Sequence, residues 1–102
     1  DKAPEFFKGD ERHFLENWVY VYLKYPDSAR IMGVQGVVNV EFVVEKDGSV
    51  SNVKVTRGVD DDLDREAVRV VSASPKWRPA IKNGEKVRVK YSLPIEFRLK
   101  KR

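Results

Sequence analysis

The sequence predicts an α+β domain: a three-stranded antiparallel sheet packed against two main helices, in α-β-β-α-β order, with the last strand at an edge. Two strand patterns and one turn carry this prediction. Apolar side chains occupy the odd positions of residues 87–99, and Val38, Val40 and Phe42 alternate with polar or outward residues in the same way, which is typical of strands with one buried face. Asp47-Gly48 then supplies a hairpin turn.

Length and composition fit one small folded unit. The chain has 102 residues, with 41% hydrophobic residues, one His and no Cys. A chain of this size buries roughly 65% of the surface that its unfolded form exposes, which is enough for one core. The longest apolar run, from Trp18 to Leu23, is far shorter than the roughly 20 residues of a membrane-spanning helix. We expect an extended leader over residues 1–8 and a single domain over residues 9–102, and Asp1 in place of Met suggests a piece of a longer protein.

The first predicted helix covers residues 10–23. Asp10 is a natural N-cap, and an acidic residue follows it in the first turn. A second, short helical segment is predicted over residues 26–32, because Pro26 suits the first position of a helix and Gly33 ends it. The apolar stripe of the first helix consists of Phe14, Leu15, Trp18 and Tyr22.

A hairpin follows these helices. The first strand is predicted over residues 34–45 and the second over residues 50–57, on either side of the Asp47-Gly48 turn. Val53 and Val55 face inward in the second strand, opposite polar neighbours. The short turn makes the two strands antiparallel neighbours.

Four aspartates within five residues begin the next segment. Such a cluster suggests a calcium loop, but it lacks the glycine and the closing glutamate of an EF-hand. A helix start explains the cluster better, because Leu63, Ala67, Val70 and Val71 follow at helical spacing and acidic side chains in a first turn face the positive end of the helix dipole. Pro75 ends this helix.

The chain then runs through a rigid connector, residues 75–80, whose Trp77 is predicted to cover the core. Asn83-Gly84 forms a turn, and residues 87–99 form the last strand. A strand reached through a helix usually returns beside the first strand, so we expect the last strand at an edge of the sheet. Pro94 agrees with this position, because proline lacks the amide that a central strand needs.

Positive charge is concentrated near the carboxyl terminus. Residues 75–102 carry 10 Lys+Arg and 2 Asp+Glu, whereas residues 1–74 carry 10 and 14. A basic segment can attract an acidic peptide, a nucleic acid or an acidic membrane, or it can be a solvated strand face. The sequence predicts no enzyme, no metal and no cofactor, because His13 is alone on a helix and no nucleophile elbow or phosphate loop is present.

Several short motifs occur in order along the chain: Tyr25-Pro26, Gly33-x-x-Gly36, Asp47-Gly48, Trp77-x-Pro79 and the closing alternation through Leu99. Together they resemble the C-terminal domain of the TonB family, over nearly the whole chain from Gly9 onward. The resemblance implies a periplasmic domain of a protein anchored in the inner membrane by a missing N-terminal segment. We expect no nucleic acid among the partners, for a reason in the residues that is given below.

The resemblance also implies partners and a mechanism. TonB proteins couple the proton-motive force, through ExbB and ExbD, to outer-membrane transporters for iron chelates, cobalamin or glycans. The domain grips a short transporter segment, the TonB box, which adds as a strand beside the last one. Residues just before the family's Tyr-Pro pair also touch the box.

Strand addition agrees with the residues themselves, since an open edge offers unpaired backbone groups to an extended peptide. Pro94 limits the expected pairing to residues 87–93, and Arg88 and Lys90 are expected to steer acidic residues that flank the peptide. The expected partner-binding residues are Leu23, Lys24, Tyr25, Val87, Arg88, Val89, Lys90, Tyr91, Ser92 and Leu93.

Two alternatives stay open at this point. The domain could be a TonB-like terminal module of another envelope protein, such as a sensor or a peptidase. A basic sheet that binds nucleic acid is less favoured, because the alternation places Tyr91 and Phe97 on the buried face, where they cannot stack on bases.

Overall fold

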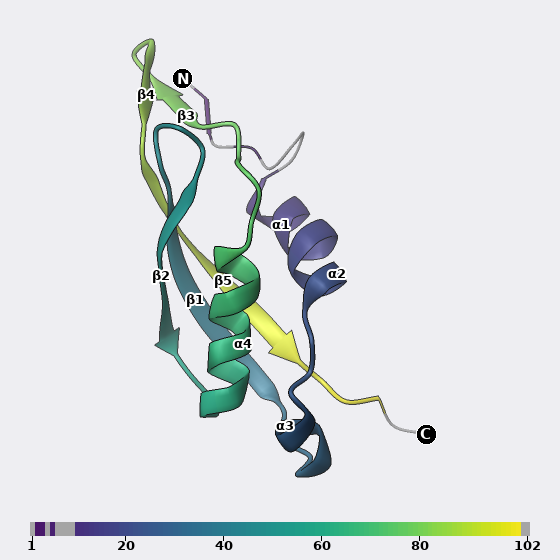
Figure 1. The fold of residues 1–102 in the computed structure, drawn as a ribbon. Helices are drawn as coiled ribbons and strands as arrows, with labels where there is room; N and C mark the ends of the chain where they lie inside the picture. The colour runs from purple at the N-terminus through teal and green to yellow at the C-terminus, as the bar shows by residue number, and fades with distance from the viewer. Residues whose placement is uncertain (1, 4, 6–9, 101–102) are drawn as a thin grey trace.

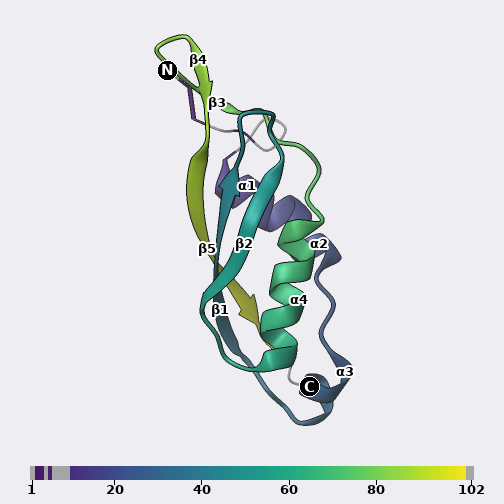
Figure 2. The ribbon, with the colours of Figure 1, turned by 60° about the vertical axis from the view of Figure 1, so that its left-hand side comes forward.

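The computed structural model describes residues 2, 3, 5 and 10–100. A three-stranded antiparallel sheet forms one layer, and helices that cover one of its faces form the other (Figures 1 and 2). The strand order is β2-β1-β5: β1 Gly36–Val44 is central, β2 Val50–Arg57 flanks it on one side and β5 Val89–Phe97 on the other. The predicted fold class and the edge position of the last strand are therefore confirmed.

The sheet follows the predicted alternation. In β1, Val38, Val40 and Phe42 are fully buried on the face that the helices cover. The β1–β2 hairpin closes through the predicted turn, where Gly48 has a φ of 89° and its N–H donates to the Glu45 carbonyl at 2.9 Å. β1 and β5 pair without interruption from Gly36–Phe97 to Val44–Val89, so β5 keeps one regular alternation along its whole length.

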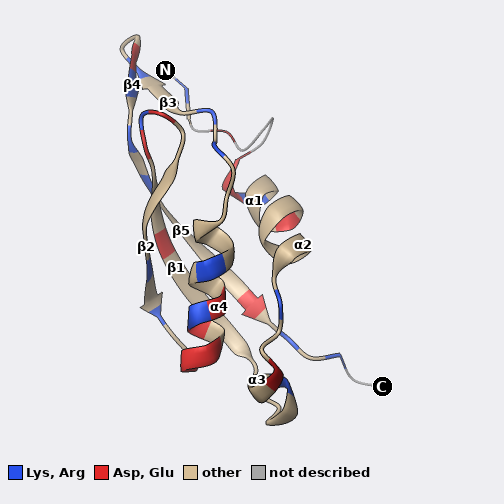
Figure 3. Cartoon of the chain, viewed as in Figure 1, with Lys and Arg blue, Asp and Glu red and all other residues tan. Residues whose placement is uncertain are grey.

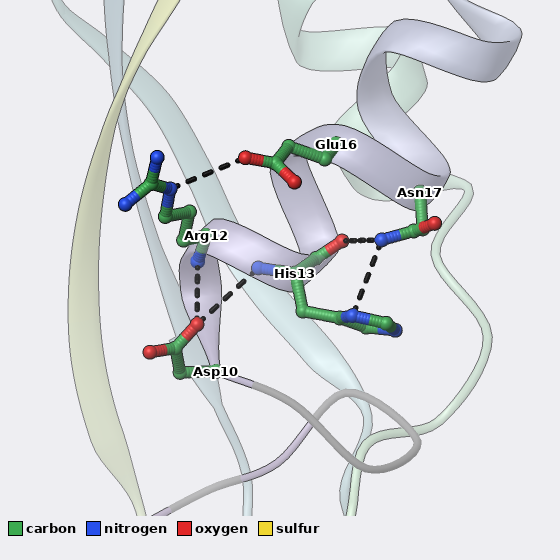
Figure 4. A network of polar contacts seen from close by, with 5 residues as sticks. All are labelled: Asp10, Arg12, His13, Glu16 and Asn17. Atoms are coloured by element: carbon green, nitrogen blue, oxygen red, sulfur yellow. Dashed lines mark hydrogen bonds and ion pairs between the residues drawn. The ribbon is translucent and has the colours of Figure 1, made fainter.

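The first helical region has three parts: α1 Glu11–Phe14, the π-helical segment η1 Leu15–Val19, and α2 Tyr20–Tyr22. Asp10 is the N-cap, as predicted, and its Oδ1 accepts from the backbone amides of Arg12 at 3.1 Å and His13 at 3.3 Å (Figure 4). The side-chain amide of Asn17 lies 3.1 Å from Nδ1 of His13 and donates to the His13 carbonyl at 3.0 Å. These contacts place His13 in a network on the helix surface.

The π-helical turn changes which residues face the sheet. The Tyr20 N–H donates to the Leu15 carbonyl, five residues back, so the chain needs more residues per turn here than in an α-helix. Phe14 and Val19, also five residues apart, are both fully buried, whereas Tyr22 is 52% exposed. The predicted helix is confirmed, but the predicted placement of Tyr22 on the buried stripe is wrong because that stripe assumed a constant 3.6 residues per turn.

The other two helices begin within one residue of the predicted starts, although Pro26 precedes the first helical residue and does not occupy it. Pro26 is the N-cap residue of α3 Asp27–Ile31, and Asp60 caps α4 Asp61–Ser72 by accepting from the amides of Asp62 at 3.0 Å and Leu63 at 3.3 Å. Asp64 accepts from the Val59 amide at 3.0 Å. Among the described residues, no group of three or more His, Cys, Asp or Glu side chains could hold a metal ion. The aspartate cluster thus initiates and caps a helix.

The segment after α4 contains a hairpin that the sequence analysis missed. β3 Ala80–Lys82 pairs with β4 Glu85–Val87 across the predicted Asn83-Gly84 turn. The predicted last strand, residues 87–99, is therefore two strands, separated at Arg88. β4 pairs only with β3, whereas β5 pairs with β1, because the chain changes partner where β1 ends at Val44.

Part of the expected leader pairs with this hairpin. Lys2 and Ile81 exchange backbone hydrogen bonds of 2.7 and 2.8 Å, and Glu5 and Arg78 exchange bonds of 2.9 and 2.7 Å. The remaining leader residues (1, 4 and 6–8), Gly9 and the last two residues of the expected domain lie outside the described residues. None of the helices in the described part of the chain is long and apolar enough to span a membrane.

An aromatic cluster closes the core at the start of β5. The Phe42 ring centroid lies 5.8 Å from those of both Phe14 and Trp77, and Tyr91 stacks on Trp77 at 5.7 Å. Trp77 is 3% exposed, which confirms that it covers the core. Its amide donates to the Gly48 carbonyl at 2.8 Å, and this bond ties the connector to the β1–β2 turn.

Glu66 ties α4 to the segment between α2 and α3. This carboxylate, 9% exposed, accepts from the Lys24 amide at 2.7 Å and from Nε and Nη2 of Arg69 at 2.6 and 2.8 Å. Burial alone would raise its pKa, but the bonds from Arg69 and from the Lys24 amide outweigh burial, and the pKa of Glu66 lies below its ordinary value of 4.5.

We expect Glu66→Gln to lower the free energy of unfolding by about 1–2 kcal/mol at pH 7, because it weakens two charge-assisted contacts in a partly dry site. Since the folded-state pKa is depressed, the stabilisation is complete above pH 4.5 and disappears as the pH falls through the folded-state pKa. Urea unfolding at pH 7 and at pH 3 should therefore show a difference between wild type and variant that narrows in acid. Glu85→Gln, an exposed control, should change stability by less than about 0.5 kcal/mol.

Candidate partner-binding site

β5 is an edge strand of the sheet, as β2 is on the opposite side. β1 occupies its inner edge, and no strand lies beside its outer edge in the described residues (Figure 2). An edge strand exposes unpaired N–H and C=O groups on alternate residues.

The Tyr20 side chain shows which amides of β5 point outward. The Tyr20 hydroxyl accepts a hydrogen bond of 3.1 Å from the Glu96 amide, and Tyr20 lies on α2, not on β1. The Glu96 amide therefore points away from β1. Because backbone groups alternate along a strand and the β1–β5 register is unbroken, Lys90, Ser92 and Pro94 also direct their backbone groups outward.

Pro94 fits this geometry. Its position opposite Asn39 is in phase with Glu96, so its ring nitrogen faces outward and the β1–β5 ladder loses no hydrogen bond. Among the described residues, the outward groups of β5 without a partner are the amides of Lys90 and Ser92 and the carbonyls of Lys90, Ser92, Pro94 and Glu96. The stretch with free amides thus ends at Glu96, whose amide is bonded to Tyr20.

We expect Tyr20→Phe to expose the Glu96 amide. Hydrogen exchange at this amide should accelerate several-fold, and stability should fall by about 0.5–1.5 kcal/mol, since one hydrogen bond is lost. Tyr22→Phe is the matched control, because Tyr22 lies on the same helix and is similarly exposed, at 52% against 42% for Tyr20. Equal exchange of Glu96 in both variants would contradict the assigned direction of the β5 amides.

The predicted contact residues on the last strand divide into three groups. Val87 belongs to β4 and pairs with Ala80, and Arg88 lies between the two strands. Lys90 and Ser92 direct both their backbone groups and their exposed side chains away from the core. Val89, Tyr91 and Leu93 place their side chains on the helix-covered face, and their backbone groups face β1.

Leu23, Lys24 and Tyr25 lie at the other end of β5. The Tyr25 ring packs edge-on against Phe97 at 5.6 Å, and its hydroxyl donates to the Val34 carbonyl. The Lys24 amide is bonded to Glu66 on α4. Tyr91 and Phe97 are six positions apart, about 20 Å along a strand, so Tyr25 packs at the opposite end of β5 from Val89 and Tyr91.

The cations of the site differ in their partners. Arg88 bonds the Glu45 carboxylate through Nε and Nη2, both at 3.0 Å, and Ser51 and Arg88 together lower the pKa of Glu45. Lys90 lies 3.9 Å from Glu41, which also pairs with Lys54 at 3.3 Å. Basic segments recur along the β3–β4 hairpin and the start of β5 (Figure 3). Because Arg88 and Lys90 already have acidic partners, they are weaker attractors for an acidic peptide than the sequence suggested.

The aromatic side chains of β5 are too buried to stack on nucleic-acid bases. Phe97 is 1% exposed, and Tyr91 is half-buried against Trp77, with its pKa raised first by burial and then by Glu11 and Asp10. The aromatic residues of β5 therefore belong to the core. What the edge offers is main-chain hydrogen bonding.

The fold and this edge define a class: a small α+β domain whose last strand offers an open edge suited to an extended peptide. The sequence matches the family described as Gram-negative bacterial TonB protein C-terminal over residues 21–99. The chain belongs to this family, which is one of non-enzymatic proteins, and the expectation that it is not an enzyme is confirmed by that membership.

Relatives and solved structures agree. The chain is 40% identical to Protein TonB of Haemophilus influenzae over 72 residues, covering 68% of this chain and 27% of that protein. It is 37% identical over 79 residues to Protein TonB of Xanthomonas campestris pv. campestris, covering 74% and 34%. The matched part thus spans between a quarter and about a third of these relatives.

Two solved structures share the fold. The solution structure of the TonB C-terminal domain of Helicobacter pylori superposes with a TM-score of 0.66 at 27% identity, covering 86% of this chain and 79% of that one. The domain from Pseudomonas aeruginosa gives a TM-score of 0.60 at 26% identity, covering 78% and 80%. Membership implies a domain of a Gram-negative envelope protein with a role in transport.

Proposed function

We propose that this domain works in the periplasm and binds the TonB box of outer-membrane transporters by strand addition to β5. The observation that carries the proposal is the open stretch of β5, where the outward groups of Lys90 and Ser92 and the carbonyl of Pro94 have no partner among the described residues. An extended peptide that pairs with this stretch adds a fourth strand, in the order β2-β1-β5-peptide.

The expected affinity is modest. Five backbone hydrogen bonds at about 0.5–1.5 kcal/mol each are offset by the cost of ordering a flexible peptide, about 1–2 kcal/mol per residue. Side-chain contacts must therefore contribute, and dissociation constants in the micromolar range are expected. A weak complex suits a protein that must release each transporter after use.

The rest of the proposal follows from family membership. The full-length protein is anchored in the inner membrane, works with ExbB and ExbD, and transmits the proton-motive force to the transporter that holds the box. Leu23, Lys24 and Tyr25 contact a box only if it continues past Pro94 toward Phe97, because Tyr25 packs at that end of β5.

Titration of the labelled domain with TonB-box peptides tests the proposal. We expect the amide signals of Lys90 and Ser92 to shift most, because these two amides would donate to the peptide. The outer residues of β2, the other edge strand, should not respond. Shifts that cluster on β2, or none on β5 at saturating peptide, would overturn strand addition at β5.

A further inference from the structure

The described residues of the leader lie as a third strand beside the β3–β4 hairpin (Figure 1). Lys2 exchanges two backbone hydrogen bonds with Ile81, and Glu5 exchanges two with Arg78, all between 2.7 and 2.9 Å. The order of the strands is therefore leader-β3-β4. The family match begins at residue 21, so the leader and its contact with β3 lie outside the part of the chain that the family shares.

The leader supports a hairpin that has little support of its own. β3 and β4 share only three residue pairs, and a two-stranded hairpin is marginally stable in water, whereas a third strand makes it more stable. The connector that leads into β3 is held on two sides, because the Trp77 amide donates to Gly48 and Arg78 pairs with Glu5. Release of the leader would leave the connector held through Trp77 and the hairpin without its third strand.

The hairpin continues directly into the partner-binding edge. β4 ends at Val87 and β5 begins at Val89. Lys2 and Ala3 also line one groove of about 340 Å³ together with Val87, Val89 and Tyr91, so the leader lies close to the first residues of β5. A hairpin that is held in place fixes the direction of these residues, and a peptide that binds to a prearranged strand does not have to order it first.

We propose that the leader is a positioning segment for the partner-binding edge: its docking on β3 orders β4 and the start of β5, and thereby strengthens the binding of the added strand. The coupling acts in both directions, because two linked binding events change each other's affinity by the same factor. A bound peptide thus favours the docked leader, and release of the leader favours release of the peptide. This inference rests on the proposed strand addition and adds a means of regulating that site.

Substitutions in the leader test the proposal and leave the sequence of the hairpin unchanged. Lys2→Pro combined with Glu5→Pro removes both leader amides that donate to the chain around β3. The amides of Ile81 and Arg78 report on docking because they donate to leader carbonyls, and their hydrogen exchange should accelerate at least about tenfold. Affinity for a TonB-box peptide should fall about fivefold. Lys2→Ala combined with Glu5→Ala, the matched control, keeps the amides and should keep slow exchange and the affinity.

The unmodified domain provides the reciprocal measurement. A saturating TonB-box peptide should slow exchange at the Ile81 and Arg78 amides about fivefold, although neither residue belongs to β5. A leader that only stabilises the fold would give a different result. Its loss would lower the thermal midpoint, but the peptide affinity would not change and the peptide would not protect these two amides.

The outcomes separate this inference from the proposed function. Weaker peptide binding by the proline variant, together with protection of Ile81 and Arg78 by the peptide, supports both. Fast exchange at these amides with unchanged peptide affinity overturns the positioning role and leaves strand addition standing. Equal exchange in the proline and alanine variants overturns the docking of the leader. No binding of a TonB box to the unmodified domain overturns both proposals.

Discussion

Ser92→Pro is expected to weaken TonB-box binding at least tenfold while the domain stays folded. Ser92 directs its amide outward, in phase with Glu96, whose amide bonds to Tyr20. The substitution removes one of two donors and places a ring where the incoming backbone must lie. A peptide carbonyl that loses its partner costs about 1–3 kcal/mol. Pro94, at an equivalent position, shows that β5 accepts proline there.

Ser92→Ala is the matched control, since it keeps the amide and removes only an exposed hydroxyl. Circular dichroism and the thermal midpoint should be nearly the same for both variants, and peptide titration should separate them. Unchanged affinity in a folded Ser92→Pro protein would reject the site. Proline at Val89 or Tyr91 is unsuitable as a test, because those amides face β1 and the substitution would break the β1–β5 ladder.

Phe42→Ala is expected to lower the free energy of unfolding by about 3–5 kcal/mol, the largest stability effect that we predict. Phe42 is fully buried, and its ring lies within 5.9 Å of those of Phe14, Trp77 and Tyr91. Truncation leaves a cavity that β1, paired on both sides, cannot collapse to fill. A domain of this size has only about 5–15 kcal/mol of stability, so the variant should be close to unfolding at 37 °C.

Val37→Ala on the same strand is the control. Val37 points to the uncovered face of β1 and is 40% exposed, so its truncation should cost less than about 1 kcal/mol. Urea unfolding of the two variants measures the difference. Similar losses in both would contradict the assignment of the two faces of β1.

Local patterns predicted much of this fold. The β1–β2 hairpin follows from alternation around Asp47-Gly48, and the start of α4 follows from Asp60 and the spacing of Leu63 and Ala67. These features depend on residues that are close in the sequence, so their turn and cap preferences can be predicted from local patterns alone. The edge position of β5 also followed, from the connection rule and from Pro94.

Other features were decided by contacts between distant residues. The π-helical turn lets Phe14 and Val19 both reach the core. Burial of both side chains depends on packing against the sheet, and a regular helical period of hydrophobic residues does not predict it. The strand predicted over residues 87–99 changes partner at Arg88 because β1 ends at Val44, and the length of β1 is a property of another part of the chain.

The candidate site shows the same division. The sequence by itself determined that the last strand alternates, carries Pro94 and lies at an edge, because period and proline chemistry are local. Only the tertiary structure decided that the amides of Lys90 and Ser92 point outward, that Tyr20 closes the edge at Glu96, and that Arg88 and Lys90 are already paired. Tyr20 and Glu96 are 76 residues apart, and no local pattern states which distant groups will meet when the chain packs.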